Sequence, residues 1–225
     1  MSAVGRRPHV VAVAVTDGAP IFELAVPCEV FGIDRADLAD PWYELRLCAA
    51  GPGPGPPRTA AGLAVHTPYG LDQLPEADTV VVTACPRSVQ LDPPPALLDA
   101  LRAAHERGRR IVSLCSGIYP LAAAGLLTGR RATLHWMAAA DFAHRFPEVD
   151  TDPSSLYVED GTILTSAGTG AAIDACLHLV RLDHGSAVAN EVARRMVVPP
   201  HREGGQTQYA KPARPPSRCG GTTMR

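Results

Sequence analysis

The 225-residue sequence has almost no lysine and too little positive charge to attract polyanions. Lys211 is the single lysine, which we interpret as coding bias rather than function. The formal net charge of −2 gives no general attraction to nucleic acid or to an anionic membrane surface. Residues 202–225 hold five basic side chains and one acidic one, which leaves −6 on residues 1–201. Since DNA-reading domains are basic, this distribution argues against DNA recognition by the main body of the chain.

Several sequence signatures are also missing. No apolar stretch approaches the length of a membrane span, and the first apolar run is too short for a signal peptide. The six cysteines include no CxxC pair and no Cys/His cluster with zinc spacing. Neither a GxGxxG nor a P-loop pattern occurs, so no nucleotide site is predicted. We therefore expect a cytoplasmic protein with reduced thiols, no metal, no cofactor and no membrane partner.

Apolar residues make up 46% of the sequence, enough for a sizeable core, and predicted strands alternate with predicted helices. The predicted strands are 9–16, 43–50, 62–67, 77–84 and 109–115; the predicted helices are 21–36, 93–108, 117–129, 137–147, 169–185 and 186–198; residues 156–168 are predicted to form a hairpin. This alternation predicts an α/β fold, with a mostly parallel sheet and helices on both faces.

The composition changes after Val198. Residues 1–198 are predicted to form one domain. Residues 199–225 are rich in Pro, Gly and Arg and have few apolar side chains, so they are predicted to be a disordered tail or linker.

A cysteine stands between a predicted strand and a predicted helix in IVSLCSGIYPLAAAGLL, residues 111–127. The N–H groups and positive dipole end of the helix would lower the pKa of the Cys115 thiol and raise its reactivity. Ser116 and Gly117 are small, so they would allow a tight turn and a close ligand. The alternative is that Cys115 is only a small buried hydrophobic residue.

Other candidate residues lie elsewhere in the sequence, and Glu23 is expected at the same edge of the predicted sheet as Cys115. Glu23 begins a helix after the first strand and would be a hydrogen-bond partner or proton acceptor of Cys115, or only a solvated charge. His135 would be a base or a packed core residue. Gly168 and Thr169, in the SAGTG segment, would bind an anion or only form a tight turn.

Five segments resemble the PfpI-like superfamily, which has a class I glutamine amidotransferase-like, flavodoxin-type fold. They are DGAPIFELAVPCEVFG, SLCSG, LAAAGLLTGRRATLHW, LYVEDGTILTSAGTGAAIDACLHLV and VANEVARRMVVPPHREGGQTQY, within about residues 9–209. More narrowly, the sequence resembles the N-terminal domain of GlxA-type regulators of the AraC/XylS family. The resemblance implies a dimeric α/β sandwich. Cys115 would stand at the nucleophile elbow, which is the sharp turn from a strand into a helix, with Glu23 beside it.

The sequence also departs from parts of that superfamily. Glutamine amidotransferases have glycine where Ser113 stands and need a late His–Glu pair, which is not found. PfpI-type proteases have histidine at the position of Ser116, and isocyanide hydratases have Asp where Glu23 stands. The regulators continue into a helix-turn-helix domain, which we expect this chain to lack, so DNA is expected as a partner only through such a domain.

Two functional hypotheses follow from the resemblance. In the first, the chain is the ligand-sensing, dimerising domain of an AraC-type regulator, truncated before its DNA-binding half, with a small-molecule ligand and a second copy of itself as partners. In the second, it is a cysteine-dependent enzyme of the isocyanide hydratase or glyoxalase/deglycase type. Cys115 would then attack an electrophilic carbon while Glu23 manages the proton.

Overall fold

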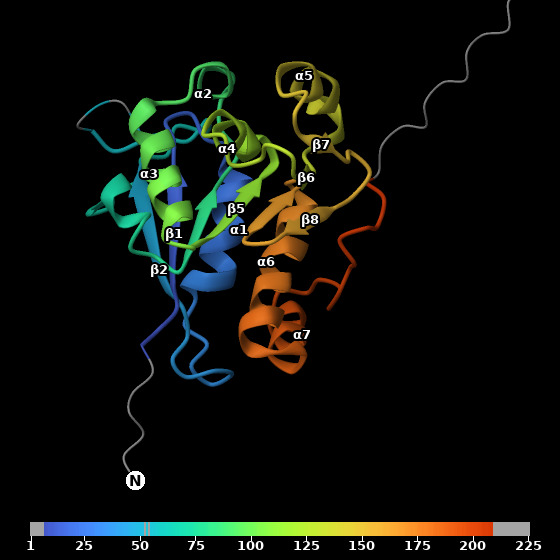
Figure 1. Cartoon of the computed structure of the whole chain (residues 1–225). Coiled ribbons are helices and arrows are strands. Elements are labelled where there is room, and N and C mark those ends of the chain that lie inside the picture. Colours follow the sequence, from blue (N-terminus) through green and yellow to red (C-terminus); the bar gives the residue numbers. More distant parts are fainter. Residues whose placement is uncertain (1–6, 52, 54, 209–225) are drawn as a thin grey trace, which may run out of the picture.

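A computed structural model describes residues 7–51, 53 and 55–208 (Figure 1). It contains a seven-stranded sheet with the order β3-β2-β1-β4-β5-β9-β8. The bounds are β1 Val10–Val15, β2 Glu44–Ala49, β3 Tyr69–Gly70, β4 Thr79–Val82, β5 Arg110–Leu114, β8 Tyr157–Asp160 and β9 Ile163–Ser166. Neighbouring strands are parallel except for β8 and β9, which form the predicted hairpin. A second, two-stranded sheet joins β6 Arg131–Ala132 to β7 Asp150–Thr151.

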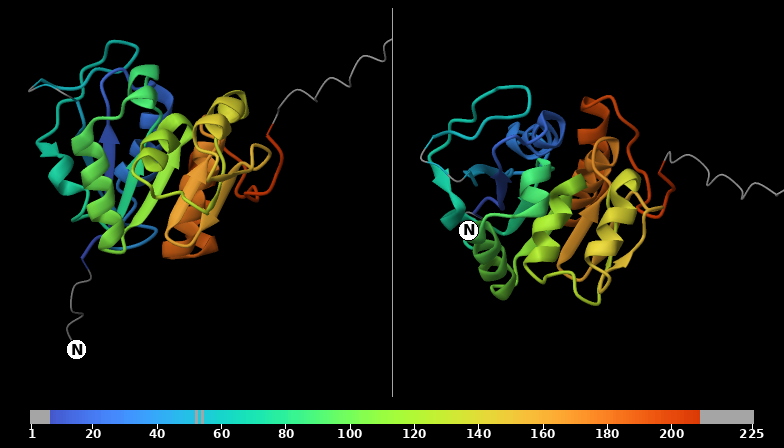
Figure 2. Two further views of the ribbon diagram at one scale, coloured as in Figure 1. Left: turned by 45° about the horizontal axis from the view of Figure 1, so that its top comes forward. Right: turned by 90° about the horizontal axis from the view of Figure 1, so that it is seen from above.

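Helices cover both faces of the large sheet (Figure 2). They are α1 Ile21–Gly32, α2 Arg87–Leu91, α3 Pro95–Glu106, α4 Ile118–Ala123, α5 Ala139–Arg145, α6 Gly170–His184 and α7 Ser186–Arg195. Successive strand residues point to opposite faces, so β1 contributes to two separate cores. Val11, Val13 and Val15 pack on the side of α1, α6 and α7. Val10, Ala12 and Ala14 pack on the side of α3 and α4.

The α/β sandwich predicted from the sequence is confirmed, but several elements differ. Helix α1 ends at Gly32 rather than at 36, α2 and β7 were not predicted, and the two largest differences concern α4 and residues 62–67. Helix α4 ends at Ala123 instead of continuing to 129, because Gly125 adopts a left-handed φ of +81° and turns the chain. Residues 62–67 do not form a strand of the sheet. They fold back on their own loop, where Val65 N–H donates to the Pro57 carbonyl and Ala64 bridges Arg58. The edge strand β3 comes later, at Tyr69–Gly70.

The C-terminal prediction differs from the structure over residues 201–208. These residues were expected to belong to a disordered tail, yet they are bound to the domain by backbone and side-chain hydrogen bonds. Composition misled here because a segment with few apolar residues can still be held by hydrogen bonds to an exposed strand edge. The remaining predicted tail, 209–225, lies outside the described residues.

The parallel strands β1, β4, β5 and β9 place all of their C-terminal ends at one edge of the sheet, which we call the carboxyl edge. The opposite edge, where these strands begin, is the amino edge. Ligand sites of open α/β sheets form at the carboxyl edge. Within the described part of the chain, no helix has the length and apolar character needed to cross a membrane.

Candidate functional site at the carboxyl edge

Cys115 follows directly after β5 and has a φ of +54°. A residue with a side chain rarely adopts this left-handed conformation, so the surrounding structure must hold it there. One 3₁₀ turn, Cys115–Gly117, leads from the cysteine into α4. The strand-to-helix position predicted for Cys115 is therefore present, and its backbone is strained.

Gly168 packs directly against Cys115 from the neighbouring strand. Leu114 and Ser166 are paired in β5 and β9, which brings the residues after each strand together. A Cβ atom built on Gly168 would lie 2.1 Å from the Cβ of Cys115, and Gly168 also has a φ of +80°. Only glycine satisfies both conditions, so this position is dictated by the approach of the two loops.

Glu23 is buried at the same edge, with 3% of its surface exposed. It lies in the first turn of α1, and its Oε1 accepts a hydrogen bond from the Thr169 backbone N–H at 3.3 Å. Thr169 precedes α6 and has a φ of +44°. The solvated alternative for Glu23 is therefore wrong: this carboxyl group is enclosed, and a helix N-terminus donates to it.

The expected lowering of the Cys115 pKa is also wrong. Burial and, to a lesser degree, the nearby charge of Glu23 raise the pKa of the Cys115 thiol to about 11, although the Ser116 backbone N–H acts in the opposite direction. For the Cys115 pKa, the removal of water and the presence of a second negative charge therefore outweigh the N–H donors of the helix. At pH 8 about one molecule in a thousand would carry the thiolate.

Ser116 and Gly117, which are predicted to bind a ligand, contact the end of β4 and the residues that follow it. The Ser116 hydroxyl accepts from the Cys85 backbone N–H at 2.9 Å and donates to the Cys85 carbonyl at 3.0 Å. A Cβ atom on Gly117 would lie 2.2 Å from the Val82 carbonyl oxygen. Both residues fasten the elbow to the neighbouring strand.

A cavity of about 180 Å³ lies next to Gly168 and Thr169, and neither Cys115 nor Glu23 lines it. The predicted residues His135, Gly168 and Thr169 line it, and the latter two connect it to Cys115 and Glu23. The His135 Nδ1 accepts a hydrogen bond from the Met137 backbone N–H at 3.3 Å. Because that nitrogen is an acceptor, the proton of the neutral ring lies on Nε2.

The other residues that line this cavity were not predicted, and they include Trp136, Arg202 and Gln208. The last two come from the segment that was assigned to the tail. A signal for them existed, because GGQTQY was among the segments that carry the resemblance. The Pro- and Gly-rich composition around that segment instead indicated a disordered tail.

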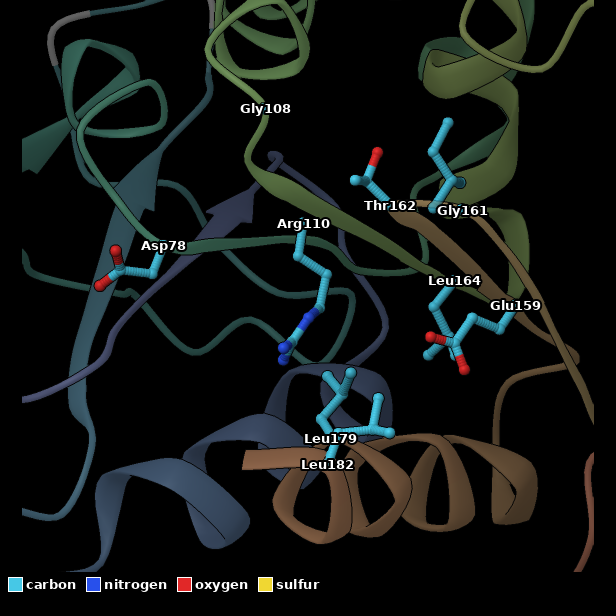
Figure 3. A pocket seen from close by; sticks show the side chains of 10 residues that line it. Asp78, Gly108, Arg110, Glu159, Gly161, Thr162, Leu164, Leu179 and Leu182 are labelled. Carbon is cyan, nitrogen blue, oxygen red and sulfur yellow. The ribbon is translucent and has the colours of Figure 1, made fainter. Parts of the chain in front are cut away.

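A larger cavity, of about 350 Å³, lies at the amino edge (Figure 3). There the Arg110 side chain points from β5 toward Leu179 and Leu182 on α6. Its charged residues have strong partners: Arg110 binds Asp183 through two hydrogen bonds of 3.0 and 2.7 Å, and Glu159 binds His178 at 2.8 Å. We place the candidate site at the carboxyl edge, where Cys115 and Thr169 have strained backbone conformations.

The described residues contain no group of three His, Cys, Asp or Glu side chains that could hold a metal ion. The family model of the DJ-1/PfpI family matches residues 9–182. The chain belongs to the DJ-1/PfpI family. The matched region spans the strands of the sheet, Glu23, Cys115 and the start of α6, so it contains the whole elbow.

Curated relatives of this DJ-1/PfpI protein include regulators and an enzyme. The HTH-type transcriptional regulator ArgR of Pseudomonas aeruginosa is 41% identical over 114 residues, which cover 51% of this chain and 34% of the regulator. Isonitrile hydratase of Pseudomonas putida is 30% identical over 127 residues, which cover 56% of this chain and 54% of the hydratase. The matched region is thus about a third of the regulator and half of the enzyme.

Solved structures show the same fold. An AraC family transcriptional regulator from Pseudomonas putida superposes with a TM-score of 0.72 at 21% identity, covering 84% of this chain and 100% of that chain. At this identity the likeness concerns the DJ-1/PfpI fold alone.

Proposed function

We propose that this chain is the ligand-sensing, dimerising domain of an AraC-type transcriptional regulator, and that the cavity beside Cys115 holds its small-molecule ligand. The observation that carries the proposal is the elbow itself: Cys115 stands in a strained conformation beside a cavity, yet its surroundings keep the thiol protonated. A pocket of this kind binds without needing a nucleophile. The similarity to regulators supports the same conclusion.

A screen of pooled small metabolites by thermal denaturation tests this proposal. A ligand of the cavity should raise the melting temperature, since binding to the folded state alone stabilises it by mass action. The effect should be lost in Trp136→Ala, which removes a side chain from the cavity wall. It should persist in Leu91→Ala, an exposed apolar side chain on α2. Light scattering should give the mass of a dimer; a monomer at all concentrations would contradict the dimerising role.

A second candidate is a cysteine-dependent enzyme, favoured by the similarity to isonitrile hydratase and by Glu23 at the elbow. In that case Cys115 would attack an electrophilic carbon, with Glu23 taking the thiol proton. Turnover of an isocyanide or a 2-oxoaldehyde that disappears in Cys115→Ser would establish this function. Absence of turnover, together with a ligand that stabilises the protein, would establish the first.

A further inference from the structure

Residues 201–208, which we call the exit segment, run beside the loop that leads into β8. The Leu156 backbone N–H donates to the Gly204 carbonyl at 2.6 Å, Thr207 forms an antiparallel bridge with Ser155, and the Gln208 N–H donates to the Ser154 carbonyl at 2.8 Å. Close packing requires glycine at 204, where a Cβ atom would lie 2.4 Å from the Tyr157 carbonyl oxygen. The segment thus adds backbone pairing at an edge of the structure.

The side chain of Gln208 forms hydrogen bonds to the residues on both sides of His135. Its Oε1 accepts from the Trp136 backbone N–H at 3.0 Å, and its Nε2 donates to the Leu134 carbonyl at 3.0 Å. The Nε2 also donates to the Ser155 carbonyl at 2.9 Å. Gln208 is 7% exposed, so these bonds are shielded from water. The residues on both sides of His135 are therefore held by one side chain from the exit segment.

The other end of the exit segment is attached to α6. The Arg202 guanidinium donates to both carboxylate oxygens of Asp174, with its Nε at 2.9 Å and an Nη at 2.5 Å. The Tyr157 hydroxyl donates to the Arg202 carbonyl at 3.2 Å. The segment consequently contacts the helix that begins at the cavity as well as the loop that carries His135.

From these contacts we propose that Gln208 is a positioning residue of the candidate site, and that the exit segment is a wall of the cavity. When the exit segment is docked, His135 and Trp136 are held in place, and when it is released they are not, so the two changes occur together in one equilibrium. Binding of a molecule to this wall would then favour the docked exit segment, which leads to the chain beyond residue 208. By the same amount, docking of the segment would favour binding of the molecule. This consequence for sensing rests on the proposed function; the positioning role of Gln208 does not.

The test compares Gln208→Glu with Gln206→Ala in the full chain, without any added small molecule. Glutamate at 208 keeps the size but replaces the N–H₂ group that donates to Leu134 and Ser155 with a negative oxygen facing their carbonyls. Gln206 is exposed two residues earlier and serves as the matched control. The readouts are amide hydrogen exchange of residues 134–137 and 201–208, tryptic cleavage after Arg202, and the NMR signals of the His135 ring.

We expect exchange at Trp136 and cleavage after Arg202 to rise at least tenfold in Gln208→Glu, with a shift of the His135 ring signals and an almost unchanged unfolding midpoint. Gln206→Ala should match the wild type in all of these. Should the glutamate variant not fold, Gln208→Met supplies the comparison without a buried charge. Unchanged exchange and ring signals at residues 134–137, despite release of the segment, would overturn the proposal. The ligand screen is separate, so either idea can fail without the other.

Discussion

The two edges of the sheet use their polar residues in opposite ways. At the amino edge, Asp183 accepts two hydrogen bonds from Arg110 and one from the Tyr43 hydroxyl, so its charge is well compensated. At the carboxyl edge, Cys115 and Thr169 adopt left-handed backbone conformations, and the buried Glu23 lies beside the thiol and raises its pKa. Paired charges stabilise a fold. Strained backbone conformations, and a buried carboxylate next to a thiol whose pKa it raises, are instead concentrated at functional sites. The cavities at the amino edge, although larger, are thus not the better candidate sites.

The largest effect is expected from Gly168→Ala at the carboxyl edge. The new methyl group would collide with Cys115 and would also require a left-handed conformation. The control is Gly125→Ala, which has nearly the same φ of +81° but no atom within 4 Å of its Cβ position. The control should cost about 1–2 kcal/mol of unfolding free energy from the conformation alone. Gly168→Ala should cost roughly 1–3 kcal/mol more because of overpacking.

Urea denaturation of both glycine variants measures this difference. Equal losses would mean that the loops after β5 and β9 can separate freely. The carboxyl edge would then be less constrained than the contact between Gly168 and Cys115 indicates.

Asp183→Asn should break the charge compensation at the amino edge. Hydrogen bonds to charged groups contribute about 1.5–3 kcal/mol, so a loss of that order is expected. Burial alone raises the pKa of Asp183, but Arg110 and Tyr43 outweigh it and hold that pKa below its ordinary value. The stabilisation is therefore complete above the unfolded-state value of about 4 and is lost as the pH falls through the lower folded-state value.

Denaturation from pH 7 to pH 2 should show this loss in the wild type and a flatter profile in Asp183→Asn. Asp99→Asn removes an exposed ion pair with Arg102 on α3 and should change stability by less than about 1 kcal/mol. Alkylation of Cys115 should be the same in both variants. A change in that rate would show that the two edges are coupled.

The smallest expected effect is kinetic. Glu23→Gln removes the negative charge that helps to raise the Cys115 pKa, so that pKa should fall. More thiolate at pH 8 then means faster alkylation by iodoacetamide, by roughly threefold to tenfold. Mass spectrometry of the peptide with Cys115 measures the rate, and Glu29→Gln on the same helix is the control. Slower alkylation in Glu23→Gln would instead identify Glu23 as the proton acceptor, in favour of the enzyme.

Part of the site could be predicted because the alternation of strands and helices, which local patterns reveal, indicates strands that run in the same direction. Cys115 and Glu23 were expected at one edge, since each follows a strand of a parallel sheet. Gly168 was predicted only as part of an anion site or a tight turn, and the structure joins all three through contacts at that edge. Gln208 could not be predicted in this way. Its partner Trp136 is 72 residues away, and nothing in a Gly-rich segment indicates which carbonyl groups it will meet.

The sequence alone determined the α/β sandwich, because runs of buried valine alternate with amphipathic helices and leave few other ways to cover a sheet. It also determined that a cysteine ends a central strand. Only the tertiary structure decided whether the thiol of that cysteine is protonated. Whether helix donors or burial and Glu23 control the thiol depends on how closely distant segments pack, and their packing raises its pKa. The same close packing turned a predicted tail into a wall of the cavity, because hydrogen-bond partners are set by positions in space and not by composition.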